Sequence, residues 1–239
     1  MKLEKYSDNK KLLHVMNRIH GGPWPKFLTE NFELLKHWRQ LYKQYPEWQL
    51  LFRDGIEYIG LCNLAPLNWD GEPESLNEGL LPTLEKIIET PQQSNTLCCF
   101  SIVVGKEHVG EGISIKMLNE VKKLAIDAGY KYILFPVRPM YKKRYPITPL
   151  ADYVQWMRGN LPFDPWIRTL AKIDAKILKV MPNSVKVQAS VSDWENWTDI
   201  YFGQTGDYII PKGHAPLHID LEKNMGIYAE EGLWMKLTL

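Results

Sequence analysis

Residues 96–139 read TLCCFSIVVGKEHVGEGISIKMLNEVKKLAIDAGYKYILFPVRP, and the architecture of the chain follows from this stretch. It begins with a short apolar run over 97–104 that ends at Gly105, which predicts a buried strand. Apolar residues then recur at helical spacing from Ile113 to Ala128, and Gly129 follows where a helix C-cap is expected. A second apolar run, over 130–137, predicts another strand. A strand, a crossover helix and a second strand of this length make a βαβ unit with parallel strands.

The loop before the helix, 106–112, carries the chemistry of this unit. Gly110 and Gly112 let backbone N–H groups turn toward an anion, the helix dipole adds to the attraction, and Ser114 offers a hydroxyl. The alternative interpretation is that the two glycines only form a tight turn between the strand and the helix and bind no anion. The dinucleotide fingerprint fails because Ile115 stands where its third glycine belongs, and no Gly-Lys-Ser/Thr run exists for a Walker loop.

This stretch resembles the GNAT N-acetyltransferase superfamily. There, a loop of the form R/Q-x-x-G-x-G/A and the following helix N-terminus hold the pyrophosphate of an acyl-CoA. The resemblance implies that acetyl-CoA or another acyl-CoA is the co-substrate. No metal is expected, because no set of metal ligands appears at motif spacing. Glu107 stands where Arg or Gln is usual, which removes a cation or an amide from near the phosphates. The implied loop contacts are His108, Val109, Gly110, Glu111, Gly112, Ile113 and Ser114.

Segments further along the chain resemble a longer bacterial subgroup of the same superfamily, which carries PVRP–K–YP and FDPW elements. Two positions depart from that subgroup. Leu170 stands where a histidine is common, and residues 230–234 read EEGLW where EPN–W is expected, so no role is transferred to either position. The matching residues are Pro136–Pro139, Lys142, Tyr145-Pro146, Tyr153, Trp156, Phe163–Trp166, Arg168 and the later Trp194-Glu195-x-Trp197-Thr198.

The fold class implied is α/β (α+β): a GNAT-like fold with a mixed central sheet, flanking helices and an antiparallel C-terminal extension. We expect a single domain over 1–239. Its parts are a helical N-terminal part over 1–45, the sheet with the CoA-binding βαβ unit over 46–139, and an aromatic and proline-rich loop-helix segment with C-terminal strands over 140–239.

Composition limits the functions open to the chain. Its 239 residues are 45% hydrophobic and 24% charged, as in ordinary globular proteins. A net charge of +1 gives no electrostatic case for nucleic acid or an anionic membrane. Residues 1–11, MKLEKYSDNKK, are charged and lack the apolar core expected of a signal peptide, and no apolar run approaches membrane-spanning length. Three cysteines, Cys62, Cys98 and Cys99, make no disulfide framework and favour the reducing cytoplasm.

The rest of the first half predicts helices and a hairpin. Apolar spacing predicts an amphipathic helix over 1–20 and a second one from Pro25 to Tyr42. Asp54-Gly55 between two apolar runs predicts a β-hairpin, and a short helix is expected over 80–89. Glu57 is expected to face outward from its strand.

The second half predicts a helix over 150–158 and another that begins after Asp164, with Asp164 as N-cap and Pro165 at its first position. From Lys176 onward, several short strands are expected, namely AKILKV, SVKVQASV, DIYF (199–202), DYIIP, APLHIDL and MGIYAE. His214 and His218 are four residues apart, but Pro216 between them argues against a helical zinc pair.

The resemblance also implies a mechanism. A backbone N–H of Ile102, Val103 or Val104 polarises the thioester carbonyl, and a tyrosine just beyond the second strand protonates the leaving thiolate. Tyr145, in the shared YP element, is the first choice, Tyr141 is the second, and a packed loop aromatic is the alternative for both. Lys142, in the basic run 142–144, is either a contact for the CoA phosphates or part of a solvated loop.

The function expected is therefore an acyl-CoA-dependent acyltransferase. It would act as an N-acetyltransferase, by direct attack of an amine in a ternary complex, because no Ser-His-Asp or Cys-His pattern suggests a covalent route. A small-molecule acceptor is expected, but the sequence does not identify it, and monomer and homodimer stay open. Two alternatives remain: a GNAT-fold protein that binds CoA without catalysis, and a nucleotide-dependent transferase.

Overall fold

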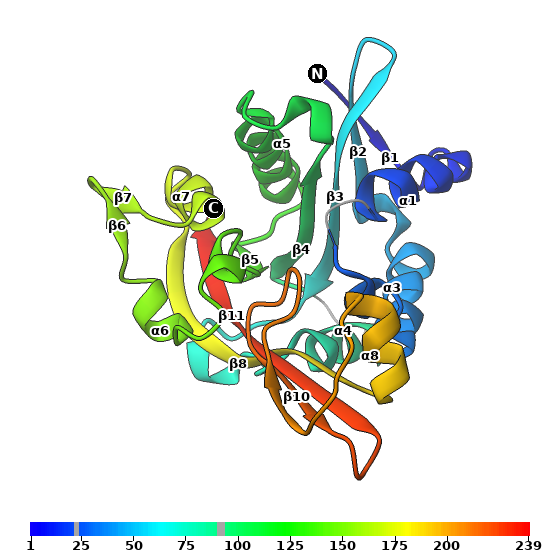
Figure 1. Cartoon of the computed structure of the whole chain (residues 1–239). Helices are drawn as coiled ribbons and strands as arrows, with labels where there is room; N and C mark the ends of the chain where they lie inside the picture. The colour runs from blue at the N-terminus through cyan, green and yellow to red at the C-terminus, as the bar shows by residue number, and fades with distance from the viewer. Residues whose placement is uncertain (22–23, 90–93) are drawn as a thin grey trace.

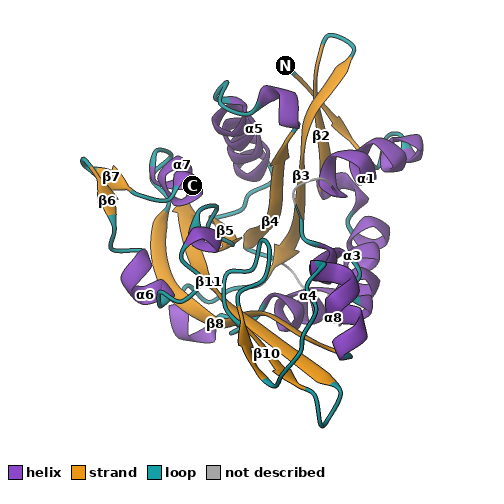
Figure 2. Ribbon diagram, viewed as in Figure 1, coloured by secondary structure: helices purple, strands orange, loops and turns teal. Residues whose placement is uncertain are grey.

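A computed structural model describes residues 1–21, 24–89 and 94–239, and in these residues one nine-stranded sheet runs through the whole molecule (Figures 1 and 2). The strand order is β1-β2-β3-β4-β5-β11-β10-β9, and β8 pairs with the other edge of β11. The bounds are β1 Lys2–Lys5, β2 Gln49–Asp54, β3 Glu57–Leu67, β4 Thr96–Val104, β5 Tyr132–Val137, β8 Lys176–Ala189, β9 Gly206–Tyr208, β10 Leu217–Asp220 and β11 Met225–Thr238.

The sheet is mixed, as predicted. β4 and β5 run parallel, whereas the other neighbouring strands of this sheet pair antiparallel. β8 to β11 form the expected antiparallel extension at the C-terminal end of the chain. The predicted hairpin is present between β2 and β3, where Gly55 takes a φ of 54°.

Helices cover both faces of the sheet. α5 and α7 lie on one face, and α1, α3, α4 and α8 lie on the other (Figure 1). The α-helices are α1 Leu13–Gly21, α2 Lys26–Thr29, α3 Phe32–Gln44, α4 Leu80–Glu89, α5 Ile113–Asp127, α6 Leu150–Tyr153, α7 Pro165–Ala171 and α8 Val191–Thr198. Short 3₁₀ turns span Lys10–Leu12, Pro46–Trp48, Pro73–Ser75, Lys106–His108 and Lys142–Arg144.

Alternation along the central strands divides the core between the two faces. Leu97 and Cys99 of β4 join Met117 of α5 in one hydrophobic cluster, while Cys98 and Phe100 join residues of α3 and α4 in another. Successive side chains of a strand point to opposite faces, so the two layers are built from one apolar run.

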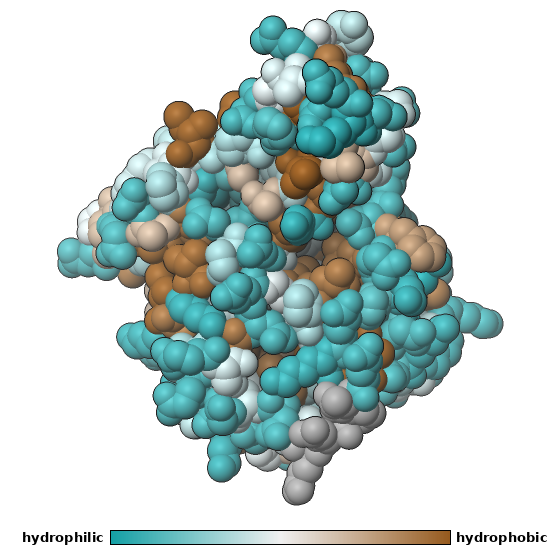
Figure 3. Space-filling view, turned by 90° about the horizontal axis from the view of Figure 1, so that it is seen from below, coloured by the Kyte–Doolittle hydropathy of each residue, from teal (hydrophilic) through white to brown (hydrophobic). Residues whose placement is uncertain are grey.

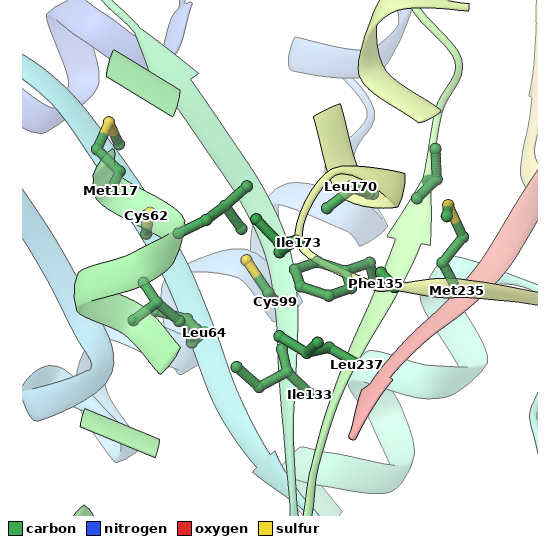
Figure 4. Packing of buried hydrophobic residues seen from close by; sticks show 14 of the residues in the cluster. Cys62, Leu64, Cys99, Met117, Ile133, Phe135, Leu170, Ile173, Met235 and Leu237 are labelled. Atoms are coloured by element: carbon green, nitrogen blue, oxygen red, sulfur yellow. The ribbon is translucent and has the colours of Figure 1, made fainter. Parts of the chain in front are cut away.

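Figure 4 shows the α5 side of the core, with Met117 from α5, Phe135 from β5 and Leu170 from α7. Leu170 occupies the position where the bacterial subgroup commonly has histidine, and it is fully buried in this cluster. Cys62, Cys98 and Cys99 are all buried and free, and burial raises the pKa of each thiol above its ordinary value.

The N-terminus differs from its prediction. Residues 2–5 form β1, an edge strand paired with β2, and the predicted helix begins only at Leu13. Lys2-Leu3-Glu4-Lys5 carries one apolar residue, so only its pairing with β2 makes it a strand. The second predicted helix is divided into α2 and α3 because the Asn31 side chain caps α3 by accepting a hydrogen bond from Leu34 N–H.

Three further predictions in the second half are wrong. The helix expected over 150–158 stops at Tyr153, because Gly159, at a φ of 62°, turns β6 (Met157–Arg158) back onto β7 (Leu161–Pro162). The two strands expected between 176 and 191 are one continuous strand, β8. Residues 191–198 form α8, opened by a capping box between Ser190 and Asp193, and residues 199–202 are not a strand.

The end of the molecule that lies lowest in Figure 1 has a mostly polar surface. Hydrophilic residues cover most of this face, and hydrophobic residues gather in patches toward its middle (Figure 3). In the described part of the chain, none of the helices has the length and hydropathy needed to cross a lipid bilayer.

Candidate active site

The parallel strands β4 and β5 separate from one another. They pair over three residues only, from Thr96–Tyr132 to Cys98–Leu134. Beyond this point β4 pairs with β3, and β5 pairs with β11. The backbones of the two parallel strands therefore diverge toward their carboxyl ends (Figure 1), and this divergence is called the opening below. The carboxyl ends of parallel strands are where α/β proteins bind ligands.

A β-bulge lies at the point of separation. Leu64 of β3 lies opposite Cys99, and Asn63 lies opposite Ser101, so Phe100 is the extra residue of β4. A bulge bends its strand and leaves one residue unpaired. Its position, two residues beyond the last pair with β5, accounts for the turn of β4 away from β5.

The register of β4 determines which backbone groups face the opening. Gly105 N–H donates to the Ile59 carbonyl at 2.8 Å, so Gly105 bonds toward β3. Because antiparallel residues alternate between bonding toward and away from their partner strand, Val103 also bonds toward β3, whereas Ile102 and Val104 direct their N–H groups toward the opening. Of the three predicted donors, Ile102 and Val104 have the required orientation, and the N–H of Val103 does not.

The glycine loop presents free backbone donors. Gly110 and Gly112 take φ angles of 100° and 72°, and a Cβ on either one would meet nothing within 4 Å. α5 starts without a side-chain cap. In the described residues, the N–H groups of Gly110, Gly112, Ile113 and Ser114 donate to no protein acceptor. The loop thus has the geometry of an anion-binding site.

Acidic side chains surround the same loop. His108 lies between two carboxylates, with Nε2 at 3.2 Å from Glu57 and Nδ1 at 3.3 Å from Glu111. Hydrogen bonding to Glu57 and Glu111 raises the pKa of His108. Glu107 is exposed. His108 therefore joins the β2–β3 hairpin to the loop.

An aromatic cluster lies beyond β5 and contains the predicted acid. The Tyr145 ring lies 4.8 Å from Trp156 and 5.9 Å from both Tyr153 and Phe163, between ring centroids. Within the described residues its hydroxyl has no hydrogen-bond partner, whereas the Tyr153 hydroxyl donates to Asp164 at 2.8 Å. The Tyr145 hydroxyl is therefore the one of these two that is free to act on a ligand.

Asp164 anchors the segment that follows β5. As predicted, it caps α7, accepting from Trp166 and Ile167 N–H. Its carboxylate also accepts from the N–H groups of Met140 and Tyr141, at 3.2 Å and 2.8 Å. Tyr141, the second candidate acid, is thereby fixed through its backbone, and its ring lies 4.1 Å from the Arg144 guanidinium.

Lys142 is buried and therefore is not part of a solvated loop. Its side chain is 2% exposed, and Nζ donates to the carbonyls of Tyr145, Pro146 and His214 at 3.0, 3.4 and 2.8 Å. Burial lowers the pKa of Lys142. With its ammonium directed at three carbonyls, Lys142 fixes the segment that carries Tyr145, and its contact with CoA phosphates stays a prediction.

A buried ionic network at the end of β5 was missed by the sequence analysis. Arg138 donates to both oxygens of Glu230, at 2.6 and 2.9 Å, and Glu230 also accepts from the Tyr228 hydroxyl. Burial would raise the pKa of Glu230, but Arg138 outweighs it, so the pKa lies below its usual value. The available signal was a carboxylate on the inward face of an alternating strand.

His214 belongs to this network through its backbone. Its N–H donates to the Tyr228 hydroxyl at 2.7 Å, and its ring is buried. Burial and the nearby Arg138 lower the pKa of His214 to about 3. His218 is exposed and pairs with Asp207. Across the described ranges, no three His, Cys, Asp or Glu side chains come together as metal ligands.

A cavity of about 250 Å³ lies at the opposite end of β4, away from the opening. Leu67, Asp70 and Lys86 are among its lining residues. The Asp70 carboxylate already accepts from Glu72 N–H and the Ser75 hydroxyl, at 2.9 and 2.6 Å. This cavity shares no residue with the glycine loop or the β4–β5 opening, so it is separate from the candidate site.

One curated protein resembles the chain over most of its length. It is the arginine N-acetyltransferase avaD of Aspergillus versicolor, which is 24% identical over 245 residues, 89% of this chain and 84% of that protein. No family model matches the chain.

Solved structures share the fold over nearly the whole chain. The GphF GNAT-like decarboxylase in complex with isobutyryl-CoA superimposes with a TM-score of 0.66 at 13% identity, covering 100% of this chain and 99% of that one. The loading GNATL domain of CurA from Lyngbya majuscula gives 0.63 at 13% identity, covering 99% and 96%. At such identities, the likeness establishes the fold.

Proposed function

Because this chain has the fold of the GNAT acyltransferase superfamily, as its sequence predicts, we propose that it is an acyl-CoA-dependent N-acetyltransferase. The observation that carries the proposal is the set of free N–H groups at Gly110, Gly112, Ile113 and Ser114, beside the separated ends of β4 and β5. The CoA-bound relative of the same fold supports an acyl-CoA as co-substrate.

Three groups of this chain divide the chemistry. The glycine loop and the start of α5 bind the pyrophosphate of the acyl-CoA. Ile102 and Val104 N–H groups polarise the thioester carbonyl, as oxyanion donors do. The Tyr145 hydroxyl gives its proton to the departing CoA thiolate, and Lys142 and Asp164 position the segment that carries it.

A neutral amine of the acceptor attacks the thioester carbonyl carbon directly, so that the C–N bond forms as the C–S bond to CoA breaks. The attacking nitrogen then loses a proton to solvent, and solvent restores the proton that Tyr145 gave to the thiolate. Cys62, Cys98 and Cys99 are buried with raised pKa values, so none is a suitable thiolate nucleophile for a covalent acyl intermediate. The arginine N-acetyltransferase relative favours an amine of a cationic amino acid as the acceptor.

Ligand-dependent stabilisation tests the proposal. Acetyl-CoA and CoA should raise the melting temperature, and ATP and NAD should not, because a ligand that binds only the native state stabilises it. Gly110→Val should abolish this shift. Gly71→Val is the matched control: Gly71 has a φ of 101° and equally open space, so it suffers the same backbone strain away from the site.

The outcomes separate the candidate functions. No shift with any CoA species would refute acyl-CoA binding. If acetyl-CoA raises the melting temperature but no amine causes release of CoA, the protein binds CoA without catalysis. The acidic residues around the loop, Glu57, Glu107 and Glu111, favour this alternative. A shift with ATP alone would indicate a nucleotide-dependent enzyme.

A further inference from the structure

Unpaired polar atoms concentrate on the face of the sheet opposite α5. In the residues that the structure describes, six buried side-chain N or O atoms have no hydrogen-bond partner. The His108 atom, Nε2, belongs to the glycine loop and is not free, because the Glu57 carboxylate lies 3.2 Å from it as an ion pair. Asn63 and Ser101 lie on the opposite face, because Leu61 and Val103, two residues away along β3 and β4, pack against α1. The others are His20 Nε2, Trp24 Nε1 and His214 Nδ1.

His20 and Trp24 belong to a chain of rings that ends at the β4 bulge. The His20 ring lies 5.8 Å from Trp24 and 5.0 Å from Trp38, between centroids. Trp38 meets Phe100 edge-on at 6.4 Å. Because Phe100 is the bulge residue, these rings lead from the end of α1 to the opening between β4 and β5, on the side away from the glycine loop.

The two unpaired nitrogens define what would satisfy them. The Trp24 indole N–H is a donor only, so it requires an acceptor oxygen, and burying it unsatisfied is costly. Burial lowers the pKa of His20 to about 4, so the ring is neutral at pH 7 and accepts a hydrogen bond at Nε2 when Nδ1 carries the proton. A neutral imidazole does not repel a cation.

The ring faces are suited to a cation. Indole faces attract ammonium and guanidinium groups, and a planar guanidinium stacks on them. Within the described part of the chain, the Lys and Arg side chains that lie over aromatic rings contact Tyr6, Tyr141, Trp69 and Tyr132, and neither Trp24 nor Trp38. These two indoles are therefore not occupied by a cation of the protein itself.

We propose that His20, Trp24 and Trp38 recognise the acceptor, and that the acceptor is a cationic amino acid. Its cationic side chain stacks on the indole of Trp38, a carboxylate oxygen accepts from Trp24 Nε1–H, and an N–H of the ligand donates to His20 Nε2. The assignment rests on the proposed acyl transfer, and it adds the residues and the substrate class.

Steady-state kinetics with paired acceptors tests the assignment. L-Arginine and agmatine share the guanidinium, but agmatine lacks the carboxylate. Trp24→Phe keeps a ring and removes the N–H, so KM for L-arginine should rise about tenfold while KM for agmatine stays unchanged. Trp38→Leu should raise KM for both acceptors, and KM for acetyl-CoA should stay constant in each variant.

Trp197→Phe is the matched control. Its indole N–H donates to Glu30 at 2.8 Å, on the same side of the molecule, so losing it should leave both acceptor KM values unchanged. Unaltered melting temperatures and an intact acetyl-CoA shift will show that each variant is folded and binds its co-substrate.

Two results would overturn the assignment while leaving the proposed function standing. One is an unchanged KM for L-arginine in Trp24→Phe. The other is a wild-type protein that responds to acetyl-CoA yet neither acetylates nor binds L-arginine or L-lysine, with binding measured by calorimetry in the presence of CoA. Loss of the acetyl-CoA shift in the wild type would instead refute the proposed function itself.

Discussion

The two faces of the sheet are made from the sequence in different ways. The face that carries α5 takes its loop, its helix and both central strands from one stretch, 96–137. The opposite face brings His20, Trp38 and Phe100 together from three separate parts of the chain. A co-substrate site can thus be encoded locally, whereas an acceptor site depends on tertiary packing.

The two faces also differ in which groups of the protein make the interactions, the backbone on one face and side chains on the other. On the α5 face, backbone N–H groups supply the anion-binding donors, so residue identity matters little beyond the glycines. On the opposite face, side chains supply the interactions, and the Arg138–Glu230 pair spans 92 positions. We therefore expect variants on the α5 face to alter CoA binding and chemistry, and those on the opposite face to alter stability and acceptor choice.

The largest effect should come from the Tyr145 hydroxyl. If it is the general acid, Tyr145→Phe should lower kcat about 10²-fold or more. Its melting temperature should not change, because the hydroxyl bonds to no described residue. Tyr153→Phe should do the reverse: it loses a buried hydrogen bond to Asp164, worth about 1 kcal/mol of stability, and keeps kcat. Equal kcat values in the two variants would remove Tyr145 from the mechanism.

The ionic network on the opposite side should dominate stability. Arg138→Met leaves the fully buried Glu230 carboxylate without its guanidinium, which should cost about 3–5 kcal/mol in urea denaturation. Adding Glu230→Gln should restore part of this loss. The exposed Lys123–Glu120 pair is the control, since Glu120→Gln should change the free energy of unfolding very little. A similar loss of unfolding free energy in Arg138→Met and Glu120→Gln would show that the buried ion pair contributes no more to stability than the exposed one.

Acid should weaken the opposite face through its buried histidines. His20 has a folded pKa of about 4 and an ordinary value of 6.5, so the unfolded chain binds the proton first as pH falls. Stability should therefore decrease from pH 6.5 to 4 by about 3 kcal/mol for this residue. His20→Gln should reduce that slope in denaturation curves, although His214 will keep part of it. His14 is an exposed histidine and serves as the control. If His14→Gln changes the pH dependence of the unfolding free energy as much as His20→Gln does, His20 is not its source.

The smallest effect should come from Glu107. Removing its charge by Glu107→Gln should improve acetyl-CoA affinity about threefold at low salt, and the gain should shrink at high salt because exposed charges are screened. Titration calorimetry at two ionic strengths measures both. Glu74→Gln, in an exposed turn remote from the loop, should leave the affinity unchanged. An equal gain there would indicate a general charge effect.

The local parts of the fold were predictable because each carries its own signal. α5 was expected over 113–128 and spans Ile113–Asp127, since glycines mark both ends of its apolar periodicity. Asp164 and Pro165 likewise fixed the start of α7. α8 was missed although Ser190 and Asp193 form a capping box in the sequence, because the alternating strand before it drew the prediction toward strands.

Tertiary contacts account for the rest. β1 is a strand only because it pairs with β2, and no sequence pattern in residues 2–5 predicts a strand. In the sequence, Lys142 resembles a solvent-exposed cation in a basic run. In the structure its ammonium donates hydrogen bonds to the backbone carbonyls of residues 145, 146 and 214, and the last of these is distant in the sequence. His20 and Trp24 showed no motif, because their relation to Phe100 arises only when α1 packs over the sheet. The site residues of the α5 face stay predictions until the kinetics are measured.

The burial of all three cysteines has a practical consequence. A chromogenic disulfide reagent will react rapidly with the thiol of released CoA. It will react only slowly with the folded protein, because the three cysteine thiols are buried and their raised pKa values keep them protonated. Turnover can then be followed against a nearly silent background. In denaturant the same reagent should count three thiols per chain, so one colour reaction reports both catalysis and the fraction of molecules that have lost their core.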